Sequence, residues 1–444
     1  MIFINGIRYS ENSKEKIEKV EKTEDKIFIN GTLHSEKLKV RNEMNFIESG
    51  TYGDAWKNKD GNVVKIYHKN KKNVIDSSII SEIAILKLLS FNKVPNIIKL
   101  LDVSMNDDDI KITMEDGGEE LHALYNYFKN NVPELIQVLF DILSTLRIFE
   151  DNKFIHFDLS PHNILYNIKT KKVSIIDFGG FIPELTTCKT FTHTLYFNEP
   201  RIDNKKSYKH DLYSLGCILI DIFYGTDCLV KLYNSKRFRK TFFLPYSENK
   251  SIELINLNNL IYKLIENINF RPSVESLMNF DMFSKCKSSY VPIKFKYFEN
   301  IIGELSEYMD SVRKIIIEWF FDINTDENNR LTNIIPLAIS IFDRYMFKNM
   351  NKIKKENFQL VSQASLSIAD ALLTKEDIDL EKLKINSVNI YNLEDIKNII
   401  FSMLKDFDYL VFIPLPKTNL DDNNNVRNLI TDLEFTKKYM KSFT

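Results

Sequence analysis

Cysteine is scarce in this sequence, long apolar runs are missing, and the charges nearly cancel. The 4 cysteines among 444 residues have no metal-type spacing, so we expect a reducing compartment and neither a disulfide framework nor a zinc site. The apolar run at residues 215–223 is interrupted by Asp221 and is too short to cross a bilayer. Lys and Arg number 60 against 61 Asp and Glu, a net charge of -1, which gives no reason to expect nucleic acid or a membrane as a partner.

The opening residues, "MIFINGIRYS", also lack the apolar core and the small-residue cleavage site of a signal peptide. We therefore expect a cytoplasmic or nuclear protein, with the 44% hydrophobic and 27% charged residues of an ordinary soluble globular chain. Heavy use of Asn, Lys and Ile is typical of an AT-rich genome, such as that of a large DNA virus or a parasite. A viral origin would place the protein in the host cell.

The periodicity of apolar residues divides the chain into a mixed unit and a helical unit. Strand-like patterns dominate residues 43–112, with one helical run at 77–89, and residues 119–283 are mostly helical. Before them, "IFING" occurs twice and ends each time in Asn-Gly, a turn signal that favours a strand pair, with a charged solvated loop as the alternative. We expect an extension, an α+β unit, a linker, an all-α unit and a tail, at 1–40, 41–284, 285–299, 300–415 and 416–444.

Two glycines in "IESGTYGDAWK" form the first candidate for phosphate binding. Gly50 and Gly53 lie three residues apart between strand-like flanks, and glycine lets a backbone pass close to phosphate oxygens. Taken alone, the motif favours a hairpin that needs glycine for its turn.

A lysine within an apolar strand is the second candidate. Lys65 interrupts "NVVKIY", and a lysine on a buried strand face needs an anionic partner. Glu82 lies in the following apolar helix pattern. A lysine that binds phosphate and is held by a helix glutamate is the arrangement of protein kinases; the alternative is an edge lysine that points to water.

The stretch "FIHFDLSPHNILY" supplies an acid and an amide at fixed spacing. Asp158 and Asn163 lie five apart, as in a kinase loop where Asp accepts the proton of the substrate hydroxyl and Asn binds a metal ion. Asp177 follows an apolar strand in "VSIIDFGGF" and would bind Mg²⁺ between the phosphates. Taken in this order, the motifs predict a protein kinase with Asp158, Lys65 and Glu82 as catalytic residues and Asn163 and Asp177 as metal ligands.

Residues 44–283 resemble the cyclin-dependent kinases in particular, through "GTYG", "DSSIISEIAILKLL", "PNIIKLLDV" and "HDLYSLGCILIDIFYG". The resemblance implies a bilobal fold with a β-rich N-lobe and a helical C-lobe, ATP and Mg²⁺ as cofactors, and a protein substrate with a Ser or Thr hydroxyl. It also implies that Asp211 supports the catalytic loop. The ATP-binding positions that it implies are Ile47, Gly50, Thr51, Tyr52, Gly53, Ala55, Lys65, the gatekeeper Met114, the hinge residues Glu115 and Asp116, and Leu165.

Several positions depart from that family's pattern. Phe157 stands where an Arg grips an activation-loop phosphate, and Ser160 stands where a Lys steadies the transferred phosphoryl group. Arg201 stands where a Glu should meet Arg271, with Glu199 as a candidate substitute. We expect an activation loop held without phosphorylation and a slower turnover. Because the charge-handling residues remain, we favour an active enzyme over the alternative, a catalytically impaired pseudokinase scaffold that recruits or activates another kinase.

The last helical unit, residues 300–415, resembles a cyclin box in "SVRKIIIEWF" and "IIPLAISIFDRYMF". An all-α domain with apolar residues at helical spacing is the simpler alternative. Where cyclins grip their kinase with Lys and Glu, this chain has Ala371 and Asn398, so we expect different docking contacts. The resulting hypothesis is a kinase fused to its activator. The activator would press the helix of Glu82 toward Lys65, either in the same chain or in a second chain.

Overall fold

The computed structural model describes four two- or three-residue strands within residues 1–43 and then a defined set of segments. Gly50, Thr51 and Tyr52, the segment 184–193, Arg201 and the tail expected at 416–444 lie outside the described residues. The described segments are 44–49, 53–68, 74–105, 109–183, 194, 196–199, 207–234, 252–288, 290–296, 307–322, 331–375, 377–386 and 390–411.

Each Asn-Gly near the start of the chain is flanked by its own pair of short strands. Strand β1 (Ile2–Ile4) pairs antiparallel with β2 (Ile7–Tyr9), and β3 (Phe28–Ile29) pairs with β4 (Thr32–Leu33). The predicted strand pairing is therefore local to each turn, and the charged stretch between the two pairs lies outside the described residues.

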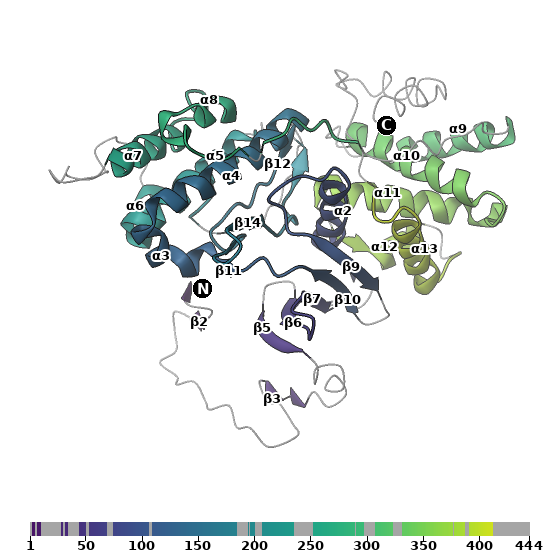
Figure 1. Ribbon diagram of the computed structural model, residues 1–444. Helices are drawn as coiled ribbons and strands as arrows, with labels where there is room; N and C mark the ends of the chain where they lie inside the picture. Colours follow the sequence, from purple (N-terminus) through teal and green to yellow (C-terminus); the bar gives the residue numbers. More distant parts are fainter. Residues whose placement is uncertain are drawn as a thin grey trace.

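The first lobe is an antiparallel sheet of five strands in the order β5-β6-β7-β10-β9 (Figure 1). Its strands are β5 (Asn45–Ser49), β6 (Gly53–Lys57), β7 (Val63–His68), β9 (Leu100–Met105) and β10 (Asp109–Met114). Helix α2 (Ser77–Phe91) packs beside β9, and the Asp76 side chain caps its N-terminus by accepting a hydrogen bond from the Ser78 amide. The helix is buried on nearly all sides, so a second partner besides the sheet covers it.

The second lobe is helical and surrounds α4 (Val132–Asn152). Helix α5 (Lys209–Tyr224) packs closely on α7 (Ile252–Leu264), and a Cβ at Gly216 would lie 2.6 Å from Ile265 Cγ2. The lobe also has α3 (Tyr125–Asn130), α6 (Thr226–Asn234), α8 (Val274–Met278), the sheet β11 (Glu119–Glu120), β13 (Ile164–Asn167) and β14 (Lys172–Ile175), and the pair β12 (Phe154–Ile155) and β15 (Ile182–Pro183). The predicted α+β fold, strand-rich and then helical, is confirmed.

The C-terminal unit is a helical domain whose central helix is α11 (Phe358–Thr374). Small buried residues such as Ala364, Ser365 and Ala369 let α10 (Leu331–Asn349) approach it closely. The buried Arg313 of α9 (Glu307–Asp322) pairs with Asp343 of α10 at 2.9 Å. Helices α12 (Leu380–Asn386) and α13 (Leu393–Asp406) complete the described part of this domain, and the predicted all-α unit is present.

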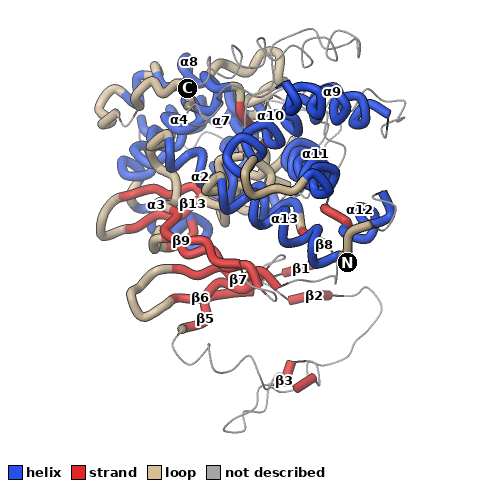
Figure 2. Tube along the Cα trace, turned by 90° about the vertical axis from the view of Figure 1, so that its right-hand side faces the viewer, coloured by secondary structure: helices blue, strands red, loops and turns tan. Residues whose placement is uncertain are grey.

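Helix α11 lies against α2 of the first lobe, side by side in both views (Figures 1 and 2). After α11, the two-residue strand β16 (Ile378–Asp379) pairs antiparallel with β8 (Val74–Ile75), directly before α2. Such short strands have no periodicity that the sequence could reveal. The helical domain is therefore joined to the kinase-like unit by backbone pairing as well as by side-chain packing.

The connector, residues 284–296, is fixed along α4. It has no helix or strand in its described part. Phe295 is buried against Phe154, and its amide donates to Asn152 Oδ1 at 2.8 Å. The Tyr290 hydroxyl donates to Asp151 at 2.8 Å. The connector is therefore held against the end of α4 as far as Phe295.

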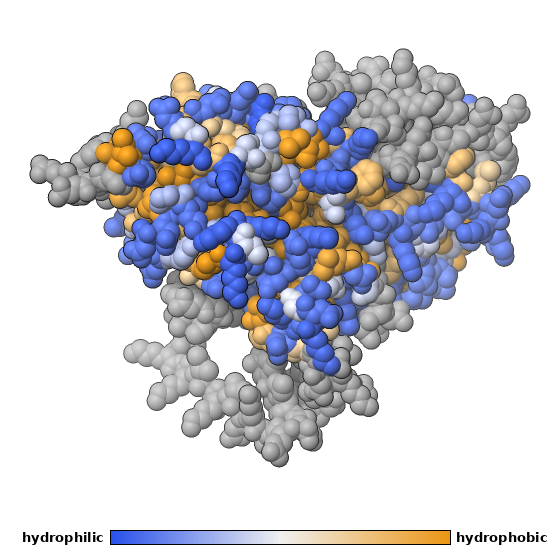
Figure 3. Space-filling model, viewed as in Figure 1, coloured by the Kyte–Doolittle hydropathy of each residue, from blue (hydrophilic) through white to orange (hydrophobic). Residues whose placement is uncertain are grey.

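On the face drawn in Figure 3, polar side chains dominate and apolar ones gather in small separate groups. Among the helices in the described part of the chain, none is both long and apolar enough to span a membrane. Cys217, Cys228 and Cys286 are free thiols.

Candidate active site

A cavity of about 1230 Å³ lies where the β-sheet meets the helical lobe. Its lining combines apolar side chains such as Val63 and Ile98 with several ionisable side chains. This combination suits a flat base and a polyphosphate. Of the predicted nucleotide-binding residues, the cavity lining includes Ile47, Gly53, Ala55, Lys65, Met114, Glu115, Asp116 and Leu165, and it also includes Glu82, Asp158, Asn163 and Asp177.

Lys65 points into this cavity and is paired with Glu82. Its Nζ lies 2.8 Å from Glu82 Oε2, and the Tyr67 hydroxyl donates a hydrogen bond to the same oxygen. Burial alone would lower the pKa of Lys65, but the charges of Glu82 and Asp177 raise it above its ordinary value. The ammonium group is therefore charged and fixed, which suits contact with a phosphate.

The catalytic loop is held in an unusual backbone conformation. Phe157 has φ 67, in the left-handed region that few non-glycine residues adopt. Asp211 of α5 stabilises this conformation because its carboxylate accepts the amides of His156 and Phe157, both at 2.8 Å. Asp158 follows at once, so its direction depends on this support, as the resemblance implied.

Asp158 is hydrogen-bonded from two sides. Asn163 Nδ2 donates to its carbonyl oxygen at 2.8 Å, and the Thr194 amide and hydroxyl donate to Oδ1 at 2.9 Å each. Burial is the main reason why the pKa of Asp158 is raised to about 6, although the Thr194 amide opposes it. A carboxylate with this pKa is ionised at neutral pH and is a competent general base.

Asp177 and Asn163 line the same cavity as Lys65, and the charge of Asp177 acts on Lys65. Asp177 has φ 60, and the amide of Gly179 donates to its Oδ1 at 3.3 Å. Carboxylate and amide oxygens are the ligands that a hard divalent cation prefers, so the residues present fit Mg²⁺. Their assignment as metal ligands stays a prediction.

Sequence reasoning missed two parts of this site. Several threonines lie close together before Thr194, and no local pattern distinguishes Thr194 from them. Gly117 and Gly118 continue the hinge, where a Cβ on Gly118 would lie 2.4 Å from Tyr166 O and one on Gly117 would lie 2.7 Å from Leu165 Cδ1. The Gly-Gly pair was the available signal, because glycine is needed where a backbone passes this close.

The departures from the family pattern have structural counterparts. Phe157 is buried with Ile155 and Ile182, where it replaces a charged side chain by an apolar contact. Ser160 is also buried and lines the cavity, and its hydroxyl has no hydrogen-bond partner among the described residues. Glu199 pairs with Arg271 at 3.2 Å, as the substitution hypothesis predicted.

A further set of contacts to α2 comes from the C-terminal domain. Lys375, at the end of α11, donates to Ser81 Oγ at 2.9 Å. Asp377 Oδ1 accepts the Ser77 amide at 3.0 Å, which satisfies one of the free N–H groups at the start of a helix. Ala371 is buried in α11 and Asn398 is exposed, so Lys375 and Asp377 supply polar contacts that those two positions do not.

Comparison with known proteins identifies both units. Residues 43–283 match the protein kinase domain model, which covers more than half of the chain, and residues 282–411 match the cyclin N-terminal domain model. The chain therefore belongs to the protein kinase family. It is a protein kinase followed by a cyclin domain, and a protein kinase domain implies ATP and metal use in general. The pseudokinase alternative is not supported.

Two curated relatives are similar to the kinase part. The cyclin-dependent kinase 4 homolog of Caenorhabditis elegans is 29% identical over 192 residues, which cover 39% of this chain and 47% of that protein. The dual specificity protein kinase YAK1 of Saccharomyces cerevisiae is 28% identical over 214 residues, 45% of this chain and 26% of that protein. The chain thus spans less than half the length of each of these relatives.

Proposed function

We propose that this chain is an ATP- and Mg²⁺-dependent serine/threonine kinase of cyclin-dependent type that is activated by its own cyclin domain. The observation that carries the proposal is the position of α2 between the two domains. Glu82 of this helix pairs with Lys65 at 2.8 Å. The Ser81 hydroxyl and the Ser77 amide of the same helix contact Lys375 and Asp377 of the C-terminal domain.

The proposed mechanism assigns a role to each charged group of the cavity. Asp158 accepts the proton of a Ser or Thr hydroxyl as its oxygen bonds to the γ-phosphorus of ATP, while the bond from that phosphorus to the β-phosphate oxygen breaks and ADP leaves. Lys65 contacts the nucleotide phosphates and is kept in place by Glu82. Asn163 and Asp177 would hold Mg²⁺, which would supply positive charge that neutralises the phosphates.

In this proposal, the position of α2 determines whether the kinase is active. A helix free to move outward would separate Glu82 from Lys65 and release the ammonium group from its fixed position. The pairing of β16 with β8 and the cap on Ser77 by Asp377 hold the N-terminal end of α2. Because a short connector joins the two domains, each experiences the other at an effective concentration of roughly millimolar. This favours docking within one chain over docking between two chains. We propose a cytoplasmic or nuclear location, in keeping with the free thiols.

The double variant Lys375→Ala/Asp377→Ala in the full chain tests this proposal. We expect kcat/KM for a Ser/Thr peptide to fall roughly tenfold, the scale of a coupling free energy between sites. Lys382→Ala, an exposed position on α12 of the same domain, is the matched control and should leave kcat/KM unchanged. Full activity in the double variant would exclude activation through these contacts.

Docking between two chains gives a different result in the same assay. A chain with Asp158→Asn has no general base but an intact cyclin domain. If domains exchange between chains, adding it in excess to the Lys375→Ala/Asp377→Ala variant restores transfer. If docking is within one chain, the addition has no effect.

A further inference from the structure

The last described part of the connector, residues 293–296, is bound by the asparagines that end two helices, and we name it the connector strap. Asn152, the last residue of α4, accepts the Phe295 amide at 2.8 Å and donates to the carbonyl two residues earlier at 2.7 Å. Asn92, which follows α2, accepts the Lys296 amide at 2.7 Å and donates to the Lys296 carbonyl at 2.8 Å. The strap is therefore bound first to the helical lobe and then to α2.

Each of these asparagines is also bound to its own helix. Asn92 Nδ2 donates to the Leu88 carbonyl at 2.9 Å, and Asn152 Nδ2 donates to the Ile148 carbonyl at 2.8 Å. Each side-chain amide thus uses both hydrogens and its oxygen, so its direction is fixed by the helix and by the strap together. An outward movement of the C-terminal end of α2 would break the bonds that Asn92 makes with the strap.

Phe295 connects the strap with the loop of Asp177 through a row of buried aromatic rings. Its ring stacks on that of Phe154 with 5.6 Å between centroids, and Phe154 stacks on Phe181 at 5.0 Å. Phe181 meets Phe178 edge to face at 5.8 Å, and Phe178 directly follows Asp177. Each of these four phenylalanines is at most 2% exposed. Because rings packed this closely leave no free space, a shift of one ring displaces the next.

We propose that Phe295 and Asn92 are positioning residues, through which the connector strap holds the loop of Asp177 and the C-terminal end of α2 in their catalytic places. This inference rests on the proposed function and adds to it a second support of the site, supplied by the connector. The cyclin domain binds α2 at Ser77 and Ser81, in the first turns of the helix, whereas Asn92 lies at its other end. The two supports therefore act on opposite ends of α2.

The Phe295 position permits a matched set of variants in the full chain. Phe295→Ala removes one ring from the row, whereas Phe295→Leu keeps most of the buried apolar volume. Phe283→Ala is the control, because it removes a buried ring that contacts α4 elsewhere, 5.5 Å from the ring of Phe140, at a similar cost in stability.

We expect Phe295→Ala to lower kcat roughly tenfold to a hundredfold, since a small misplacement near reacting groups has effects of this size. Phe295→Leu should recover most of the lost kcat. Phe283→Ala should change kcat by less than about threefold, because the loss of stability alone leaves the folded site as it was.

Hydrogen exchange without nucleotide provides a readout that does not depend on activity. In Phe295→Ala, the amides of residues 88–92 and 178–182 should exchange roughly tenfold faster than in the unchanged chain, since both segments lose local support. The amides of α11 should exchange as before, because the contacts of the cyclin domain are untouched. Asn92→Ala should accelerate exchange at residues 88–92 alone. Lys296→Ala is its matched control, because it alters an exposed side chain and keeps the backbone groups that Asn92 binds.

Two outcomes would overturn the proposal. These are exchange at residues 88–92 and 178–182 that is no faster in Phe295→Ala than in Phe283→Ala, and a kcat of Phe295→Leu no higher than that of Phe295→Ala. If Phe295→Ala does not fold, Asn92→Ala against Lys296→Ala decides the question by exchange at residues 88–92. If the unchanged chain transfers no phosphate to any Ser/Thr peptide, the proposed function fails, and the exchange measurement still decides whether the strap holds the two segments.

Discussion

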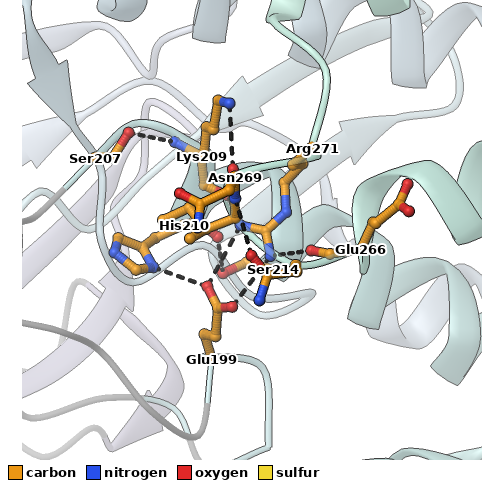
Figure 4. Close-up of polar contacts among 10 residues, drawn as sticks. Glu199, Ser207, Lys209, His210, Ser214, Glu266, Asn269 and Arg271 are labelled. Atoms are coloured by element: carbon orange, nitrogen blue, oxygen red, sulfur yellow. Dashed lines mark hydrogen bonds and ion pairs between the residues drawn. The ribbon is translucent and has the colours of Figure 1, made fainter. Parts of the chain in front are cut away.

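Helix α2 and the segment 194–199 both orient active-site groups, but they are held by different kinds of contact. Helix α2 is held by another domain, through a two-residue strand pair and hydrogen bonds from Lys375 and Asp377. Thr194 and residues 196–199 are held within their own lobe, where Glu199 pairs with the buried side chains of Arg271 and His210, a group that we name the Glu199 cluster (Figure 4). The first kind of contact can be lost by moving a domain, whereas the second can be lost only by disrupting the core of the lobe.

This difference suggests where regulation is possible. Contacts between domains can be exchanged, covered or modified at modest free-energy cost, so the position of α2 is the variable part of the site. The Glu199 cluster contains a buried charge that needs its partner, so it serves as a constant support. The comparison leads to four predictions. The first concerns a substitution that affects neither the contacts of α2 nor those of Glu199.

The largest effect is expected for Asp158→Asn. An amide cannot accept the substrate proton, and the loss of a general base lowers kcat roughly a thousandfold. The contacts of α2 and of Glu199 do not involve the Asp158 charge, so the thermal unfolding temperature in the presence of MgATP should still rise as in the unchanged chain. Phosphotransfer within tenfold of the unchanged chain would exclude Asp158 as the base.

The two supports should differ in what they contribute to stability. Glu199→Gln leaves the buried Arg271 without a charged partner and should lower the free energy of unfolding of the kinase domain by about 3 kcal/mol. Asp377→Ala removes one helix cap and should lower it by about 1 kcal/mol. Urea denaturation measures both.

Glu275→Gln is the matched control, because Glu275 is exposed and pairs with Arg147 at the surface of the same lobe. We expect a change below about 0.5 kcal/mol there. If Asp377→Ala destabilises the chain more than Glu199→Gln does, the contacts between the domains are not the weaker ones, and the contrast between them and the Glu199 cluster is wrong.

The third prediction concerns pH and tests the contact between Thr194 and the base. Since burial raises the pKa of Asp158 to about 6, the base becomes protonated below that pH, and kcat/KM for MgATP should fall about tenfold per pH unit there. Thr194→Val removes a hydrogen bond that favours the carboxylate, so the midpoint should move to higher pH. Asp211, whose pKa burial also raises to about 6, accepts hydrogen bonds from the amides of His156 and Phe157. A midpoint that does not move in Thr194→Val would therefore assign the profile to Asp211.

The sequence predicted the parts of the site that depend on residue type and spacing. Lys65, Glu82, Asp158, Asn163 and Asp177 lie in strands, a helix and loops whose patterns are local, so their convergence follows from the fold. The helical character of the last domain was readable for the same reason, because apolar residues recur at helical spacing.

What the sequence could not predict depends on pairings between distant segments. The strand β16 has two residues, and its partner β8 lies about 300 positions earlier. Lys375 and Asp377 follow the end of α11, where no motif marks them, and Thr194 is one threonine among several. The sequence did not decide whether Glu199 pairs with Arg271. A carboxylate two positions away from its usual place can reach the arginine only if the backbone of that segment brings it there.

The smallest effect is expected at the rim of the interface between α2 and the cyclin domain. Lys87 pairs with Asp408 at 2.8 Å, but the Asp408 side chain is 73% exposed, and exposed ion pairs contribute about 0–1 kcal/mol. Lys87→Ala should therefore change kcat/KM less than twofold at physiological salt, and the small difference should vanish at high salt because the pair is screened. A loss as large as that of Lys375→Ala/Asp377→Ala would mean that α2 is held along its whole length, and the domain interface would then act as a single rigid surface instead of a clamp on the N-terminal end of the helix.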